Sequence, residues 1–81
     1  MNDNYSTENF ISDKLVRLQL SNLRKSSGLT QKEIREKTGL SLTCISNIEN
    51  GDDTAPTLKS IVKYLDAIGY EMSFTKKKEI L

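Results

Sequence analysis

The sequence GLTQKEIREKTGLSLTCISNIENG, residues 28–51, decides the fold of this 81-residue chain. Its first half has the markers of a short helix. Thr30 precedes Glu33 by three residues, which is the spacing of a capping box at a helix start. Gly39 follows two helical turns later, and glycine commonly ends a helix because it tolerates the left-handed conformation. We therefore expect a two-turn helix between Thr30 and Gly39.

The second half of this stretch predicts another short helix directly after a tight turn. Ser41 is a preferred cap residue, and Ile45 and Ile48 follow at the i, i+3 spacing of an inward-facing stripe. The helix is expected to end at Gly51, where the chain would again take a left-handed conformation. Two short helices separated by so few residues have the spacing of a helix-turn-helix.

A longer helix is predicted before this unit, over residues 11–26. Its apolar residues recur at helical spacing on two separate stripes, so the helix is apolar on more than one side. One stripe would pack on the domain and the other is available to a partner molecule. The stripes are Val16, Leu20 and Leu23, and Ile11, Leu15 and Leu18.

A fourth helix is predicted after the polar loop that follows Gly51. Thr57 is its cap residue, and Gly69 ends it. Its apolar residues fall at i, i+3, i+4, i+7 and i+10, which is typical of a helix with one face on the core. This predicted inward face consists of Leu58, Ile61, Val62, Leu65 and Ile68.

The pattern changes after Gly69, because apolar Tyr70, Met72 and Phe74 alternate with polar residues. A period of two predicts a short strand. No second strand pattern occurs in the chain, and a lone strand leaves its backbone groups unpaired. We expect this strand to pair with its own copy across a two-fold axis in a dimer. The alternative is an extended tail lying on the helices.

Composition allows one small domain and few kinds of chemistry. The chain has 12 Lys plus Arg, 11 Asp plus Glu, one cysteine, Cys44, and no histidine. No internal disulfide can form, and neither a zinc site nor histidine-based catalysis is expected. We expect no enzyme activity and no cofactor. No apolar run approaches the roughly 18 residues that span a bilayer, so a cytoplasmic protein without a membrane partner is predicted.

We divide the chain accordingly into four segments. They are a flexible N-terminal segment (1–10), a helical domain (11–69), a dimerisation strand (70–75) and a basic tail (76–81).

An ordered series of short motifs extends over about 60% of the chain. It comprises Leu23-Arg24, Gly28-Leu29-Thr30-Gln31, Glu33-Ile34, Gly39-Leu40-Ser41 and Ile45-Ser46-Asn47-Ile48-Glu49-Asn50-Gly51, continued by Pro56-Thr57-Leu58 and Leu65-Asp66-Ala67-Ile68-Gly69. With these motifs at these spacings, residues 20–68 resemble the helix-turn-helix domain of the phage-repressor (Cro/repressor, or XRE) family. The resemblance implies an all-α domain of four to five helices.

The resemblance also implies a DNA-binding site. The helix after Ser41 would be the recognition helix in the major groove, where an amide such as Asn47 can pair with adenine. Helix N-termini suit phosphate oxygens without a side-chain cation. The alternative is that these polar residues form an ordinary solvated helix face. The implied base-reading residues are Leu42, Thr43, Ser46 and Asn47, and the implied phosphate contacts are Lys25, Gln31, Lys32, Ser41 and Asn50.

The resemblance further implies that Arg24 and Glu49 form a structural ion pair between the first helix and the end of the recognition helix. Two residues depart from the family pattern. Arg35 stands where a small residue is usual between the two helices, and Thr38 replaces an apolar residue. Cys44, on the recognition helix, is either a small apolar filler or a site of oxidation.

The charge pattern also departs from the family. No Lys or Arg occurs between Thr38 and Leu58, and Asp52 and Asp53 follow the recognition helix. Carboxylates near phosphates repel them and would weaken binding unless they point away from the DNA.

The C-terminal part of the sequence resembles one group of proteins within this family. A helix passing directly into an alternating strand is similar to HipB-type and HigA-type antitoxins. We therefore predict a homodimeric, sequence-specific transcriptional regulator, acting as a repressor on a palindromic double-stranded DNA operator, with a toxin protein as a candidate partner. The alternative is a protein-interaction module of the same fold that has lost DNA binding.

Overall fold

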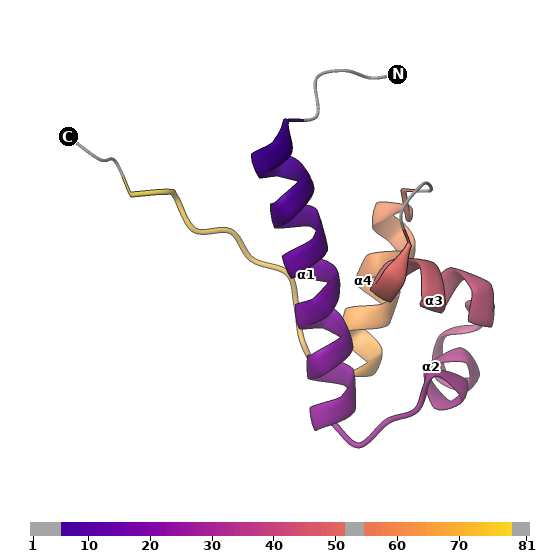
Figure 1. Cartoon of the computed structure of the whole chain (residues 1–81). Helices are drawn as coiled ribbons and strands as arrows, with labels where there is room; N and C mark the ends of the chain where they lie inside the picture. The colour runs from indigo at the N-terminus through magenta and orange to yellow at the C-terminus, as the bar shows by residue number, and fades with distance from the viewer. Residues whose placement is uncertain (1–5, 52–54, 79–81) are drawn as a thin grey trace.

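The structure is a computed structural model that describes residues 6–51 and 55–78. Within these residues the chain forms four α-helices and no strand, so the all-α prediction is confirmed for them. Figure 1 shows the long first helix standing beside the three shorter ones. The helices are α1 (Thr7–Ser26), α2 (Gln31–Thr38), α3 (Leu42–Asn50) and α4 (Leu58–Ala67).

Local capping explains where the helices begin. The side chains of Thr30, Ser41 and Thr57 each accept a hydrogen bond from the backbone N–H three residues on, as predicted. Ser6 caps α1 in the same way. Helix α1 therefore starts before the predicted residue 11, and the segment predicted as flexible, residues 1–10, overlaps its first turn. Residues 1–5 lie outside the described residues.

The two helix-ending glycines have different roles. Gly39 has φ +79° and closes α2 in the left-handed conformation, as predicted. The same prediction for Gly51 is wrong, because its φ and ψ are −64° and 147°, an extended conformation open to any residue. Gly51 is needed for space: an added Cβ would lie 1.8 Å from Asn47 Oδ1 and 2.6 Å from the Asn47 carbonyl oxygen.

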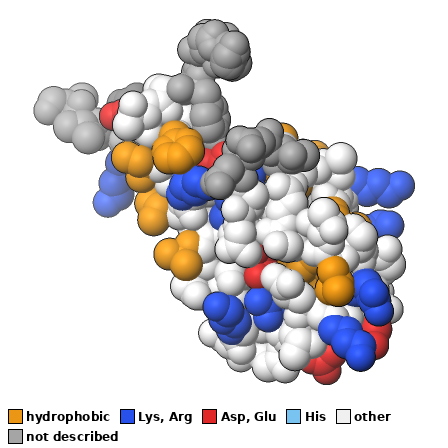
Figure 2. Space-filling view, turned by 45° about the vertical axis from the view of Figure 1, so that its right-hand side comes forward, with side chains coloured by type: hydrophobic (Ala, Val, Ile, Leu, Met, Phe, Trp, Pro, Cys, Tyr) orange, Lys and Arg blue, Asp and Glu red, His pale blue; other side chains and the backbone are white. Residues whose placement is uncertain are grey.

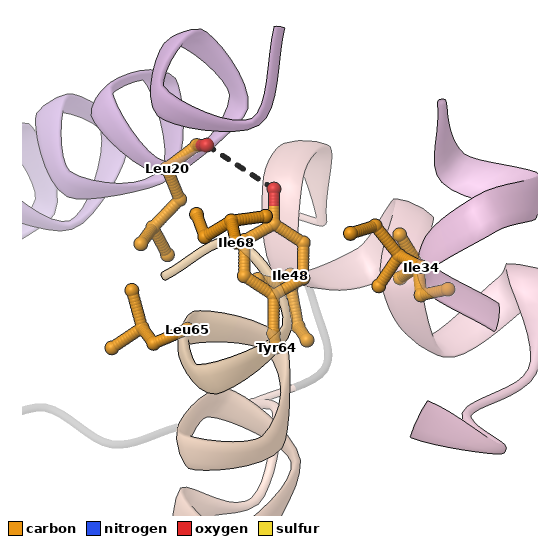
Figure 3. Packing of buried hydrophobic residues seen from close by; sticks show 7 residues of the cluster. Leu20, Ile34, Ile48, Tyr64, Leu65 and Ile68 are labelled. Atoms are coloured by element: carbon orange, nitrogen blue, oxygen red, sulfur yellow. Dashed lines mark hydrogen bonds between the residues drawn. The ribbon is translucent and has the colours of Figure 1, made fainter. Parts of the chain in front are cut away.

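The core lies where the four helices meet. Figure 3 shows Tyr64 and Leu65 of α4 pointing towards Leu20 of α1 and Ile48 of α3. Each such side chain stabilises the fold by about 1.5–3 kcal/mol relative to an exposed one. The buried apolar cluster consists of Leu20, Ile34, Ile45, Ile48, Tyr64, Leu65 and Ile68.

The predicted inward face of α4 is wrong at two positions. Leu58 is 66% exposed and Val62 is 51% exposed. Tyr64 is completely buried in their place, and its hydroxyl donates to the Leu20 carbonyl oxygen at 3.1 Å, the dashed line in Figure 3. A tyrosine can be buried only where its hydroxyl finds a partner, and this one does. The buried face of α4 therefore includes Tyr64, and Leu58 and Val62 lie outside it.

Two apolar surfaces remain exposed. On α1, the second stripe predicted for a partner, Ile11, Leu15 and Leu18, is exposed, and so is Val16, which was expected to pack on the domain. After α4, residues 70–78 have no regular secondary structure, and in Figure 1 this tail passes α1 and then leaves the helices. The predicted strand side chains Tyr70, Met72 and Phe74 are all exposed. Strand pairing with a second copy stays a prediction.

Candidate nucleic-acid interface

The turn between α2 and α3 is closed by Thr38. Its hydroxyl donates to the Ile34 carbonyl oxygen at 2.7 Å and accepts the Leu40 N–H at 3.0 Å. The chain then enters α3 at Ser41, whose hydroxyl oxygen accepts the Cys44 N–H. Thr38 stands where the family usually has an apolar residue. Its hydroxyl has a local role there, because it hydrogen-bonds to backbone groups that the turn would otherwise leave without partners.

The predicted base-reading residues gather on one surface. Leu42, Thr43 and Ser46 are exposed on α3, and Asn47 is half-buried one turn further on. Together with Gln31, Asn50 and Gly51 they line a shallow hollow of about 470 Å³. We call these seven residues the reading face. Figure 2 shows the side of the molecule to which α2 and α3 come forward: its middle is mostly uncharged, with a small acidic and a small hydrophobic patch, and basic side chains lie at several points around it, with acidic ones beside them at the lower edge.

The predicted phosphate contacts are spread more widely. Gln31 and Asn50 belong to the reading face, whereas Ser41 lies at the start of α3 and Lys32 is exposed on the first turn of α2. Lys25 lies apart from the reading face, in a second hollow that it shares with Asn50. These five residues therefore come from α1, α2 and α3 and its cap, and only Gln31 and Asn50 line the hollow of the reading face.

A buried charge network lies directly behind the reading face. Both Glu49 carboxylate oxygens accept hydrogen bonds from Arg24: Oε2 from Nε at 2.6 Å and Oε1 from Nη2 at 2.9 Å. Oε1 also accepts Gln31 Nε2 at 3.0 Å, and Oε2 accepts the Tyr64 hydroxyl. Arg24 further donates to the Leu29 carbonyl oxygen. The network ties all four helices to one carboxylate.

These contacts decide the charge state of Glu49. Burial raises the pKa of a carboxylate, but the hydrogen bonds from Arg24, Tyr64 and Gln31 outweigh it and lower the pKa of Glu49 to about 2. Burial and the neighbouring carboxylate raise the pKa of Tyr64 above its usual value of 10.0. Glu49 is thus ionised and Tyr64 neutral at neutral pH.

Two features of this network were missed by the sequence reasoning. Gln31 was expected only as a phosphate contact, yet its side-chain amide is hydrogen-bonded to Glu49 and couples the surface to the core. Tyr64 was not singled out at all. Tyr64 follows Ile61 by three residues, so the sequence indicated that both lie on the same apolar face of the helix. A tyrosine buried there usually has a hydrogen-bond partner for its hydroxyl, and this was the available signal.

The structure also shows where two other residues noted in the sequence, Arg35 and Cys44, lie. Arg35 is exposed, so it does not separate α2 from α3, and Ile34 beside it is fully buried. Cys44 is half-buried and packs against the core, which favours its reading as a small apolar filler. Asp52 and Asp53 lie outside the described residues. Within residues 6–51 and 55–78, no group of three acidic, histidine or cysteine residues is placed to hold a metal, and no helix is long and apolar enough to cross a membrane.

Comparison with known proteins agrees with this geometry. Residues 20–74 match the family model described as helix-turn-helix, which is more than half of the chain. The chain therefore belongs to the XRE-type helix-turn-helix family. That family match points to a DNA-binding regulator and not to an enzyme.

One relative among curated proteins is similar over most of this chain. It is the protein named "Putative antitoxin HigA2" of Mycobacterium tuberculosis (strain ATCC 25618 / H37Rv), with 30% identity over 63 residues. The match covers 78% of this chain and 62% of that protein, so the chain spans less than two thirds of this relative's length. No solved structure matches the chain.

Proposed function

We propose that this protein is a sequence-specific transcriptional regulator that reads double-stranded DNA with the reading face of α3 and acts as a repressor. The observation that carries the proposal is the grouping of Leu42, Thr43, Ser46 and Asn47 with Gln31 and Asn50 around one exposed hollow. A helix that presents such side chains on one exposed face fits the major groove of B-form DNA.

The reading face supplies suitable chemistry for base edges. The Asn47 amide can donate to and accept from the edge of adenine, and the methyl groups of Leu42 and Thr43 can contact a thymine methyl. The N-termini of α2 and α3 offer unpaired backbone N–H groups and a partial positive charge to phosphate oxygens. Lys25 and Lys32 would add contacts to the DNA backbone from α1 and α2.

We further propose that the protein binds a palindromic operator as a homodimer. Two recognition helices would then lie about 34 Å apart, one turn of DNA. The exposed Tyr70, Met72 and Phe74 support this, because a segment that alternates exposed apolar and polar side chains can bury the apolar ones by pairing with its own copy. The exposed stripe of Ile11, Leu15 and Leu18 on α1 offers further apolar surface to a second molecule.

The similarity to a protein named as an antitoxin supports a more specific role. We propose that this protein also binds a toxin protein and represses transcription as the antitoxin of the pair. Purification of the chain together with the product of an adjoining gene tests this role. A chain that purifies alone when both genes are expressed would contradict it.

A protein-interaction module that has lost DNA binding is the second candidate. It is favoured by the absence of Lys and Arg between Thr38 and Leu58 in the sequence. Most protein–DNA interfaces depend on cations that contact phosphates, and α3 carries none. In the proposed regulator, cations from α1 and α2 would take this role.

A selection experiment separates the two candidates. Duplexes bound by the full chain are selected from a random pool, and the affinity for the selected duplex is measured between about 50 and 200 mM salt. A regulator enriches one palindromic sequence, and its affinity falls steeply with salt. A scrambled duplex of the same composition is the control. No enrichment, and no binding at the lowest salt, would contradict DNA binding and favour the interaction module.

A further inference from the structure

The C-terminal end of α3 differs from a typical helix end in the residues that the structure describes up to Gly51. No basic residue lies in its last turn, and Gly51 is extended instead of left-handed. The last carbonyl groups of a helix have no partner within the helix, so they need donors from a left-handed cap, from side chains or from water. On α3, the Asn47 carbonyl oxygen accepts the Gly51 N–H, and additional donors to the Asn47 and Ile48 carbonyl oxygens come from another helix.

Arg17 of α1 supplies these donors. Its Nη1 donates to the Asn47 carbonyl oxygen and, at 3.3 Å, to the Ile48 carbonyl oxygen. Its Nε donates to Asp13 Oδ1 at 2.5 Å, one turn earlier on α1. Arg17 is only 8% exposed. The guanidinium is thus held by a carboxylate on its own helix and aimed at the end of α3.

Lys14 reinforces the same end. Its Nζ donates to the Gly51 carbonyl oxygen at 3.3 Å, just after α3. Two cations of α1 therefore lie beside the negative end of the α3 dipole, an arrangement that is electrostatically favourable. The cations that α3 lacks in its own sequence are provided by its neighbour.

The contact acts on a residue that the proposed function requires. Asn47 carries the amide proposed to read adenine, and its carbonyl oxygen accepts both Arg17 Nη1 and the Gly51 N–H. Arg17 lies outside residues 20–74, the part that matches the family model. The Arg17 hydrogen bonds to the end of α3 therefore come from a part of α1 that precedes the residues matched by the family model.

We propose that Arg17 is a positioning residue, which holds the last turn of α3 and thereby sets the orientation of Asn47 for base recognition. This proposal rests on the proposed DNA-binding function. Arg17 is too buried to contact DNA itself. Its loss should therefore weaken base recognition by Asn47 more than the contacts to phosphates. Most of the proposed phosphate contacts lie away from the last turn of α3, and Asn50 is the one that lies within it.

The test compares Arg17→Met with the wild-type full chain, using the selected duplex and a scrambled one. We expect about a tenfold weaker affinity for the selected duplex and a much smaller loss for the scrambled one. The salt slope should change by less than about 1, the change that the loss of one phosphate contact gives. Arg17→Lys should recover part of the loss. Lys63→Met removes one exposed cation of α4 and serves as the charge control.

Hydrogen exchange tests the same proposal without DNA. In Arg17→Met the Gly51 amide, which donates to the Asn47 carbonyl oxygen at 2.8 Å, should exchange about tenfold faster than in the wild type, while the Ile34 amide of α2 should not change. If the wild type binds no duplex, the proposed function fails and this measurement still decides the role of Arg17 in holding α3.

Three results would overturn the proposal. The first is wild-type affinity of Arg17→Met for the selected duplex, and the second is wild-type exchange at Gly51 in that variant. The third is an equal loss of affinity for both duplexes, which would indicate a general loss of structure. If Arg17→Met does not fold, Arg17→Gln, which keeps an amide donor without the charge, is measured with the same readouts.

Discussion

Arg24 and Glu49, 25 residues apart in the sequence, form a two-contact ion pair that joins α1 to the end of α3. The Glu49 side chain is only 1% exposed, and its oxygens also accept Gln31 and Tyr64. A carboxylate so completely removed from water depends on these partners, because solvent cannot replace them. The pair therefore holds α1 and α3, the helix proposed to read DNA, in a fixed arrangement.

Breaking this pair on one side should be costly. We expect Arg24→Met or Glu49→Leu alone to lower the free energy of unfolding by about 3–5 kcal/mol, because each leaves a buried charge without its partner. The double variant should be more stable than the sum of the two losses predicts. Urea unfolding of the three variants measures this. A melting temperature that is unchanged in either single variant would disprove the coupling.

Stability should also depend on pH through Glu49. Because its pKa is lowered from 4.5 to about 2 in the folded protein, its contribution is complete above pH 4.5 and is lost as the pH falls from about 4.5 to about 2. The Glu49→Gln variant should lose stability less steeply over this range. Urea midpoints measured from pH 6 downwards give the comparison.

Glu33→Gln is the control for this pH dependence. The pKa of Glu33 is also lowered, by hydrogen bonds from the Thr30 backbone and side chain, but Glu33 is exposed. Glutamine preserves the capping box, so this variant should keep most of the acid-dependent loss. Equal slopes for Glu49→Gln and the wild type would contradict the assignment.

Base recognition is tested at Asn47. Replacement by alanine removes the amide proposed to pair with adenine, and should cost about 1–3 kcal/mol of binding to the selected duplex with the fold intact. Fluorescence anisotropy measures the affinity, and circular dichroism checks the helices. Gln19→Ala, at an exposed position of α1, is the matched control. Equal operator affinity for Asn47→Ala and the wild type would refute the reading face.

Gly51 should not tolerate a side chain, for steric and not conformational reasons. Alanine can adopt its φ of −64°, but the new Cβ would lie 2.6 Å from the Asn47 carbonyl oxygen and 1.8 Å from Asn47 Oδ1. We expect Gly51→Ala to lower the free energy of unfolding by about 1–3 kcal/mol. Adding Asn47→Ala removes one of the two clashes and should restore part of that loss in denaturant unfolding. A fully stable Gly51→Ala would contradict the close approach.

The proposed dimer depends on the C-terminal segment. Removing residues 70–81 should convert the dimer into monomers, because it deletes the strand proposed to pair between copies together with the exposed Tyr70, Met72 and Phe74. Removing only residues 76–81 is the control, and should leave the dimer intact. Sedimentation velocity distinguishes the two states. Dimers that persist after the longer deletion would place the interface elsewhere.

Local signals in the sequence predicted most of the helix boundaries. Thr30, Ser41 and Thr57 cap the helices that they were expected to cap, and Gly39 closes α2 with a positive φ. Capping depends on groups within three residues of one another, so it can be read directly from the order of residues. For the same reason, the position of the turn followed from the sequence. The residues expected on the exposed face of α3 came from the resemblance to the repressor family.

The sequence alone thus determined the four helices, the turn between α2 and α3, and the residue types on the reading face. Only the tertiary structure decided which face of α4 is buried, why Gly51 must be glycine, and that Gln31, Tyr64 and Arg17 support α3. These features depend on groups that packing brings together from distant positions. No periodicity along one helix encodes such a contact, because its partner is chosen in space by how the helices meet.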